Sequence, residues 1–123
     1  MQSTFMLAGA LAGFVGVAFG AFGAHGLRGR LSPEMLAVFE TGVRYQMYHA
    51  LALMLTAAIM MTGRVDSSRA ITIAGWSFIA GMVLFSGSLY LLAVTGVTVL
   101  GAITPLGGVA FLLGWACLAV AML

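Results

Sequence analysis

Residues 4–24 read TFMLAGALAGFVGVAFGAFGA, and this stretch contains no charged side chain. A helix rises about 1.5 Å per residue, so about 20 apolar residues cross the roughly 30 Å hydrocarbon core of a bilayer. Backbone amides find no water to bond in lipid, so such a stretch closes its hydrogen bonds internally, as a helix. Residues 4–24 therefore predict a first membrane-spanning helix.

The same stretch carries a stripe of glycines spaced four, three, four and three residues apart, namely Gly9, Gly13, Gly16, Gly20 and Gly23. At about 100° per residue, these positions fall within about 80° of one helix face. A face without side chains lets another backbone approach closely, and such van der Waals packing favours helix association in lipid. We expect the stripe to be a packing surface, either for another helix of this chain or for another copy of it.

The rest of the chain has the same apolar character. Of the 123 residues, 63% are hydrophobic and 7% are charged, whereas a soluble domain has about 25% charged residues. Three more stretches are long and apolar enough to span a membrane, at about residues 45–62, 70–94 and 100–122. They lack the polar and apolar alternation of barrel strands. The sequence predicts an all-α integral membrane four-helix bundle, with residues 1–123 as a single domain surrounded by lipid.

The connections between the expected spans differ in kind. Ser32-Pro33-Glu34 has the pattern of a helix start, with a capping hydroxyl, proline in the first turn and an early acid. It predicts a short interfacial helix between the first and second spans, running into the second. The connection at residues 63–69 is short and polar. Near the fourth span, Pro105 indicates either a helix start or a kink.

Charge and cysteine content exclude some classes of protein. The net charge of +2 comes from five arginines against three acids. Arginines scattered over the connections do not form the basic patch of a nucleic-acid binder, and they suit membrane edges instead. Cys117 is the single cysteine, so no intramolecular disulfide can form.

Polar residues gather at one side of the membrane. In a bundle of four alternating spans, the end of the first, the start of the second, the end of the third and the start of the fourth share that side. The candidate binding residues expected there are His25, Arg44, Tyr45, Gln46, Tyr48, His49 and Tyr90. Trp76 and Trp115 fall toward the opposite side, as expected for part of an aromatic belt.

The second expected span is the richest in polar side chains. Glu40 and Arg44 are four residues apart and can pair on one helix face, which Tyr48 extends, while Tyr45 and His49 share a different face. Ionisable groups at membrane depth are costly and usually turn inward to partners. Two interpretations stay open: interfacial anchoring with helix pairing, or a site for a ligand or a proton.

The same segments carry a family resemblance. The stretches GAFGAHG at 20–26, TGVRYQMYHA at 41–50, FSGSLY at 85–90 and TPLGG at 104–108 resemble the bacterial four-span family catalogued as domain of unknown function four-two-three. They also resemble the eukaryotic transmembrane protein two-five-six group. The resemblance covers nearly the whole chain and implies a small protein of the bacterial inner membrane. It implies no reaction, so no catalytic residues follow from it.

Several functions compete on the sequence alone. The first is a non-enzymatic packing, accessory or lipid-binding module, as a homo-oligomer or part of a larger membrane complex. The second is a small-molecule or ion transporter, with His25, Arg44 and His49 at its mouth. The third is a cofactor binder, in which two histidines ligate haem or some of the nine methionines hold a soft metal. We expect neither a cofactor nor a metal, because methionines in so apolar a chain are usually packing residues. We do not expect an enzyme, because paired carboxylates, a nucleophile motif and a phosphate loop are missing.

Overall fold

A computed structural model describes residues 1–65 and 69–123, and every regular element in these ranges is helical. The all-α prediction is confirmed. The first two helices are α1 (Gln2–His25) and α2 (Pro33–Met61). The third rod of the bundle combines α3 (Arg69–Gly81), the π-helical turn η1 (Met82–Ser86) and α4 (Gly87–Thr95). The fourth combines the 3₁₀ helix η2 (Thr98–Ala102) and α5 (Thr104–Ala121).

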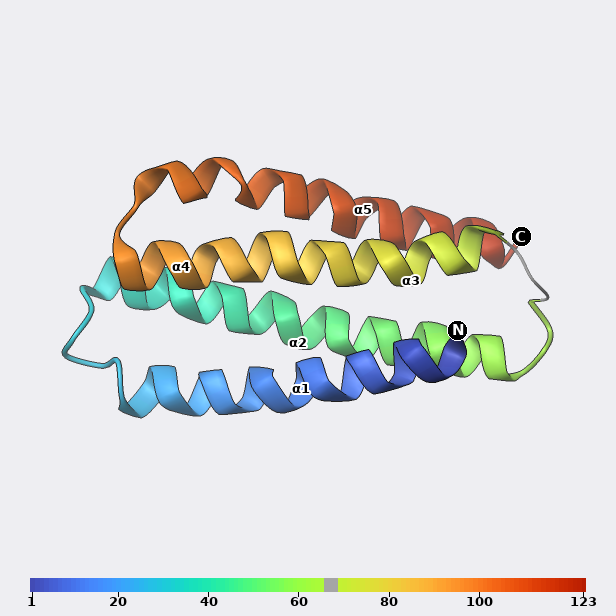
Figure 1. Cartoon of the computed structure of the whole chain (residues 1–123), viewed down its shortest axis with the longest axis horizontal. Helices are drawn as coiled ribbons and strands as arrows, with labels where there is room; N and C mark the ends of the chain where they lie inside the picture. The colour runs from blue at the N-terminus through green and yellow to red at the C-terminus, as the bar shows by residue number, and fades with distance from the viewer. Residues whose placement is uncertain (66–68) are drawn as a thin grey trace.

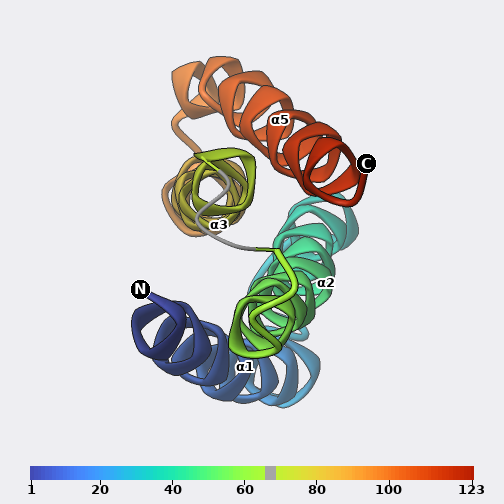
Figure 2. The ribbon, with the colours of Figure 1, turned by 90° about the vertical axis from the view of Figure 1, so that its right-hand side faces the viewer.

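The rods lie side by side and alternate in direction (Figure 1). The end of α1, the start of α2, the end of α4 and the start of α5 share one end of the bundle, which we call the His25 end. Both chain termini lie toward the opposite end, which we call the Met1 end. Seen along the rods, α1 and α5 occupy opposite edges, and α2 and α3 lie between them (Figure 2). This topology gathers segments far apart in sequence at the His25 end.

Three helical segments are long and apolar enough to cross a membrane, Gln2–His25, Arg69–Thr95 and Thr98–Ala121. These match the expected spans at residues 4–24, 70–94 and 100–122. The second expected span, residues 45–62, lies within the longer helix α2 except for Thr62, which caps its C-terminus. α2 does not reach the same apolarity because it carries charged and amide side chains along its first half, such as Glu40, Arg44 and Gln46. Residues 66–68 of the expected polar connection at 63–69 lie outside the described ranges.

The start of α2 follows the sequence signal. The Ser32 side chain accepts a hydrogen bond from the backbone N–H of Met35 at 3.2 Å, and Pro33 lies in the first turn. The short interfacial helix expected here is not a separate element, because Pro33–Met61 is one continuous helix of 29 residues. Nothing in residues 41–45 interrupts it, since even Gly42 is held by close packing on its neighbours.

The glycine stripe lies along the seam between α1 and α2. Four of its members face α2, namely Gly9, Gly16, Gly20 and Gly23, whereas Gly13 has open space beside it. A methyl group on Gly16 would stand 2.5 Å from the sulfur of Met47, so a side chain there would force α2 away. The stripe therefore packs within this chain.

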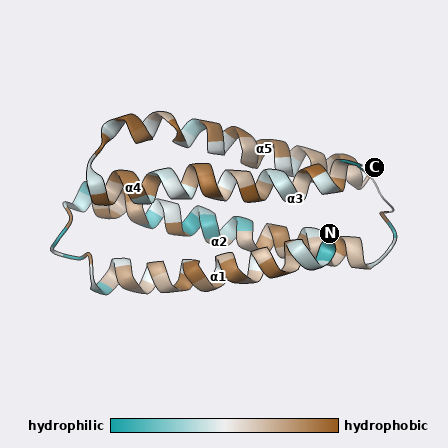
Figure 3. Ribbon diagram, viewed as in Figure 1, coloured by the Kyte–Doolittle hydropathy of each residue, from teal (hydrophilic) through white to brown (hydrophobic). Residues whose placement is uncertain are grey.

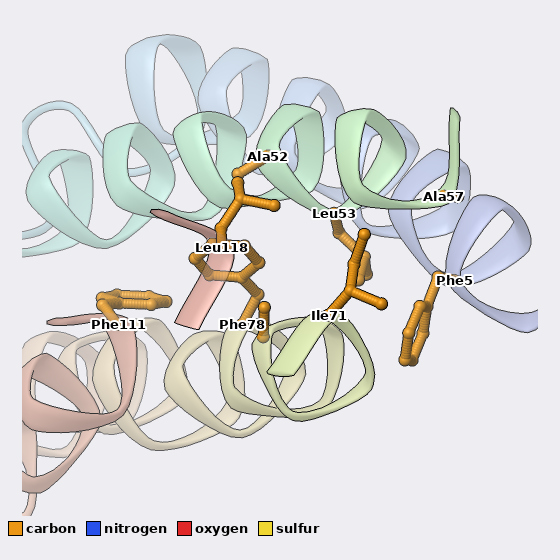
Figure 4. Packing of buried hydrophobic residues seen from close by; sticks show 9 residues of the cluster. Phe5, Ala52, Leu53, Ala57, Ile71, Phe78, Phe111 and Leu118 are labelled. Carbon is orange, nitrogen blue, oxygen red and sulfur yellow. The ribbon is translucent and has the colours of Figure 1, made fainter. Parts of the chain in front are cut away.

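A second seam joins α3 and α5, and here glycines interlock with phenylalanine rings. Gly114 faces the ring of Phe78, and a methyl group on it would stand 2.6 Å from that ring. In the reverse arrangement, Gly81 of α3 faces the ring of Phe111 of α5. These rings belong to a buried cluster that extends to Phe5 along the middle of the bundle (Figure 4). The half of the bundle toward the Met1 end is therefore filled by apolar side chains.

Two irregular turns shape the other half. In η1, the N–H of Gly87 bonds to the carbonyl of Met82, five residues back. Ser86, within this turn, donates a hydrogen bond to the carbonyl of Gly42 on α2 at 2.7 Å. Such wide turns re-aim side chains and are frequent at functional sites. α5 begins at Thr104 with Pro105 in its first turn, so the proline marks a helix start and not a kink.

Candidate functional site

The most hydrophilic residues of α2 fall in the half of the helix nearer the His25 end (Figure 3). Gln46 donates from Nε2 to the carbonyl of Ala12 at 2.8 Å. Ala12 lies at the middle of α1, which runs from residue 2 to residue 25. Gln46 therefore lies near mid-depth of the bundle, not at its edge. The expectation that all candidate residues gather at one membrane side needs this correction, because the seam with α1 fixes the depth of α2.

Gln46 is the centre of a closed connection between three rods. The hydroxyl of Tyr90 on α4 donates to Oε1 of Gln46 at 2.6 Å. The Tyr90 ring packs edge-on against Phe19 of α1, with ring centroids 5.0 Å apart. Gln46 is 7% exposed, so both ends of its amide are bonded away from solvent. This arrangement locks α1, α2 and α4 together.

His49 points toward α5. The indole N–H of Trp115 donates to Nε2 of His49 at 3.1 Å, and Nδ1 of His49 lies 2.7 Å from the carbonyl of Tyr45. An indole nitrogen is only a donor, so Nε2 is the acceptor, and Nδ1 carries the proton and donates a hydrogen bond to the carbonyl of Tyr45. The imidazole also stacks on Phe111, with centroids 3.6 Å apart and planes 9° apart. Both ring nitrogens are thus used within the protein.

A groove of about 480 Å³ opens beside this histidine, between α2 and α5. We call it the α2/α5 groove. Its lining is almost wholly apolar and comprises Tyr45, His49, Phe85, Pro105, Gly108, Val109, Phe111, Leu112 and Trp115. Along α5 the lining runs from Pro105 to Trp115, or about 15 Å at 1.5 Å per residue. Thr104, at the start of α5, bonds to Ser88, which lies seven residues before the end of α4. The groove therefore begins about 10 Å inside the His25 end and reaches about the middle of the bundle.

A second groove, of about 300 Å³, lies between α1 and α2, and we call it the α1/α2 groove. Its lining combines bare glycine backbone, apolar walls and two charged residues: Phe19, Gly20, Gly23, Phe39, Glu40, Val43 and Arg44. Glu40 and Arg44 are both exposed, and within the described ranges no ion pair of 4.0 Å or less joins them. The pairing expected from their spacing is not formed.

The structure divides the candidate residues into separate groups. Gln46 and Tyr90 lie inside the bundle, Tyr45 and His49 line the α2/α5 groove, and Arg44 lines the α1/α2 groove. The other two are exposed: His25 at the end of α1, and Tyr48 beside Tyr45. His25 and His49 do not come together. Axial ligation of haem by this pair does not fit, because Nε2 of His49 accepts from Trp115 and His25 lies at the bundle end.

No group of three or more metal-ligating side chains occurs in the part of the chain that the structure describes. The groove instead uses aromatic residues that the sequence argument did not select. Trp115 was expected in an aromatic belt; it is 44% exposed on the wall of the α2/α5 groove, where it contacts His49 and Phe78. The signal that could have found it is helical spacing, since Gly108, Phe111 and Trp115 recur at intervals of three and four on one face.

Comparison with known proteins agrees with the membrane assignment. A family model described as "Protein of unknown function (DUF423)" matches residues 19–108. The membrane protein YwdK of Bacillus subtilis is 50% identical over 120 residues, which cover 98% of this chain and 96% of that protein. The membrane protein SAB0533 of Staphylococcus aureus is 47% identical over 117 residues, covering 95% and 93% of the two chains. No solved structure matches the chain. Its relatives are membrane proteins and its helices suit several crossings, so this chain is a multi-pass bacterial membrane protein that belongs to the family described as DUF423.

Proposed function

We propose that the protein is a non-enzymatic membrane module with four crossings, and that it holds the acyl chain of a lipid in the α2/α5 groove. The observation that carries this proposal is the groove itself. It is apolar, it is lined by rigid aromatic rings, and it is open on one side of the bundle.

The proposal takes α2 as the fourth membrane-spanning helix. At 29 residues and about 1.5 Å per residue, it is longer than the roughly 30 Å hydrocarbon core. It lies against α1 from Phe39 beside Gly23 to Met54 beside Gly9. Its inward polar groups are bonded to other rods, as expected of polar residues at membrane depth.

The dimensions of the groove suit one leaflet. Its length of about 15 Å is half of the roughly 30 Å hydrocarbon core. Its outer end lies about 10 Å inside the His25 end, on the side from which an acyl chain would enter, and its inner end lies near mid-depth beside Trp115. Gly108 leaves the α5 wall bare, with the nearest atom to an added methyl group 4.0 Å away on Phe85. A hydrocarbon chain in such a groove gains dispersion contacts with several rings at once.

The polar network argues against the competing function, a transporter. Each buried side-chain nitrogen and oxygen in the described ranges has a hydrogen-bond partner. Beyond His49, toward the Met1 end, the middle of the bundle is a cluster of apolar side chains. A proton or ion would therefore have to open both the network and the core to cross. Flux in proteoliposomes equal to that in empty liposomes is the expected result, and flux that is lost on His49→Ala would favour transport.

Photochemical cross-linking tests the lipid site in a bilayer. Proteoliposomes would contain a phospholipid with a diazirine halfway along one acyl chain, and labelled residues would be mapped by mass spectrometry. The proposal predicts that labels concentrate on groove residues such as Val109 and Leu112. Labels spread equally over exposed α1 residues such as Leu11 and Phe14 would show an ordinary lipid-facing surface and would overturn the proposal.

A matched pair of variants controls this experiment. Gly108→Leu fills the groove without a backbone clash, whereas Gly13→Leu adds the same side chain where nothing lies within 4 Å. Filling removes roughly ten dispersion contacts of about 0.1–0.2 kcal/mol each, so we expect about tenfold weaker lipid retention in detergent for Gly108→Leu. Gly13→Leu should retain lipid as the unchanged protein does. Equal retention by both variants would contradict the proposal.

A further inference from the structure

The α1/α2 groove differs from the α2/α5 groove in carrying charge. Its floor is the bare backbone at Gly20 and Gly23, and its walls include Phe39 and Val43. Two exposed side chains of opposite charge, Glu40 and Arg44, follow one another along its α2 side. The space beside them, about 300 Å³, is of the order of a small polar headgroup and not of a whole lipid.

The depth of the two charges follows from the packing of α1 against α2. Phe39 packs on Gly23 and Val43 on Gly20. Because α1 ends at His25, Glu40 lies close to the His25 end, and Arg44 lies about 6 Å deeper at 1.5 Å per residue. By backbone position, Glu40 is thus the outer of the two residues and Arg44 the inner one.

A guanidinium at this depth needs an anion. Charged side chains within the span are costly, and arginine reduces the cost by extending its head toward the interface. Glu40 does not form an ion pair of 4.0 Å or less with Arg44 within the described ranges. A phosphate at the interface offers the planar guanidinium two oxygens in a matching geometry.

The order of the charges selects among phospholipids. In a phosphoethanolamine headgroup the phosphate is attached to the chains, and the primary ammonium lies farther out. Arg44 below and Glu40 above present the complementary order, one helical turn apart, where side chains are about 5–6 Å apart. A primary ammonium brings N–H donors for the carboxylate, which the quaternary ammonium of choline lacks. A glycerol headgroup would leave Glu40 without a cation.

The geometry points to a headgroup site for phosphatidylethanolamine in the α1/α2 groove, with Arg44 on the phosphate and Glu40 on the ammonium. This site is independent of the acyl chain proposed for the α2/α5 groove. His25 and Arg28 lie exposed near the same end and would attract anionic lipid without regard to headgroup structure. Selectivity between headgroups is therefore the property to measure, not binding alone.

The test is native mass spectrometry of the delipidated, full-length protein titrated with phospholipids that carry identical chains. We expect phosphatidylethanolamine to bind about five- to tenfold more tightly than phosphatidylglycerol or phosphatidylcholine, as for one or two charge-assisted hydrogen bonds. Arg44→Gln and Glu40→Gln should each remove this preference. Arg64→Gln, which removes a charge at the Met1 end, should keep it. A preference for phosphatidylglycerol in the unchanged protein would overturn the assignment in favour of general electrostatic attraction.

A charge exchange separates the ordered site from a nonspecific charge effect. The double variant Glu40→Arg with Arg44→Glu keeps the composition and the spacing but inverts the order of the charges. It should lose the preference for phosphatidylethanolamine, and an unchanged preference would contradict the proposal. Soluble glycerophosphoethanolamine should not compete at equal concentration, because the site includes the membrane surface. Full competition by it would point to a free metabolite instead.

The acyl-chain site and the headgroup site can be disproved independently of each other. Gly108→Leu blocks the α2/α5 groove and should leave headgroup selectivity intact, since Gly108 does not line the α1/α2 groove. Loss of headgroup selectivity in Gly108→Leu would show that a single lipid occupies one site, and would overturn the assignment of a separate headgroup site.

Discussion

The two sides of α2 differ in how closely the neighbouring helices pack around a polar residue. Toward α1 and α4, Gln46 is 7% exposed and is enclosed between the carbonyl of Ala12 and the hydroxyl of Tyr90. Toward α5, His49 reaches across to Trp115, and an open apolar groove lies beside the pair. In both places a polar residue of α2 forms a hydrogen bond to a neighbouring rod. The rods pack closely around Gln46, whereas a groove remains between α2 and α5 beside His49. At the depth of Gln46 the closed side is structural, and the α1/α2 groove lies nearer the His25 end. The open side is available to a ligand at the depth of His49.

The closed side should be the more sensitive to added volume. A methyl group on Gly42 would stand 2.8 Å from the Tyr90 ring, and the Gly42 carbonyl receives the Ser86 hydroxyl. Gly42→Leu should therefore cost about 3 kcal/mol, the upper end of the usual range for overpacking a tight core. The measurement is the free energy of unfolding in mixed micelles. The control is Gly87→Leu, because nothing lies within 4 Å of a methyl group on Gly87. Equal stability of the two variants would contradict the claim that α2 packs tightly on its closed side.

Removing the central amide should have the next largest effect. Gln46→Ala leaves the buried Tyr90 hydroxyl without its acceptor and opens a small cavity, so we expect a loss of about 2 kcal/mol. Tyr90→Phe in the same background should restore part of the loss. A double-mutant cycle of the two changes should give a coupling of about 0.6–1.7 kcal/mol, the range for hydrogen bonds between membrane helices. Strict additivity would show that the contact does not couple the rods.

The open side should tolerate the loss of its hydrogen bond better. Trp115→Phe removes the donor to His49 but keeps an aromatic wall, and Nε2 of His49 then borders the groove, where a bound lipid or water can approach. We expect a loss of only about 0.6 kcal/mol, the average for a hydrogen bond between membrane helices. Unfolding measured beside Gln46→Ala checks the order. A larger loss for Trp115→Phe than for Gln46→Ala would reverse the assignment of the two sides.

The smallest effect is expected outside both sides. Tyr48 is 53% exposed on α2 and only touches the edge of Tyr45. Tyr48→Ala should change stability by no more than about 0.5 kcal/mol, as surface substitutions usually do. The same unfolding assay measures it. A loss comparable to that of Gln46→Ala would mean that Tyr48 is covered by a partner, such as a second copy of the chain.

Much of the fold could be predicted because it depends on local pattern. The length of the apolar stretches predicted the three helices that are apolar enough to cross a membrane, and Ser32 with Pro33 predicted the start of α2. The depth of the polar residues could not be predicted this way. The charge of Arg44 suggested that the span begins after it, whereas the packing of Gly16 on Met47 and Gly23 on Phe39 sets how far α2 has entered the bundle.

The sequence predicted several residues that belong to the candidate site, but it did not predict which of them lie together in the structure. Gln46 and His49 are only three residues apart on α2, yet they bond to different neighbours and serve different interfaces. The turn η1 and the contact of Trp115 depend on partners more than 40 residues away, such as Gly42 for Ser86. Such contacts have no local signature in the sequence.

Trp115 gives the most direct measurement of the central claim, that the open side of α2 holds a lipid chain. A Trp76→Phe variant leaves Trp115 as the single tryptophan, and phospholipid brominated halfway along its chain quenches nearby indole fluorescence. In detergent titrations we predict saturable quenching by a single lipid per chain, abolished by Gly108→Leu and retained in Gly13→Leu. Quenching that rises without saturation, or that is the same in all three proteins, would contradict the claim.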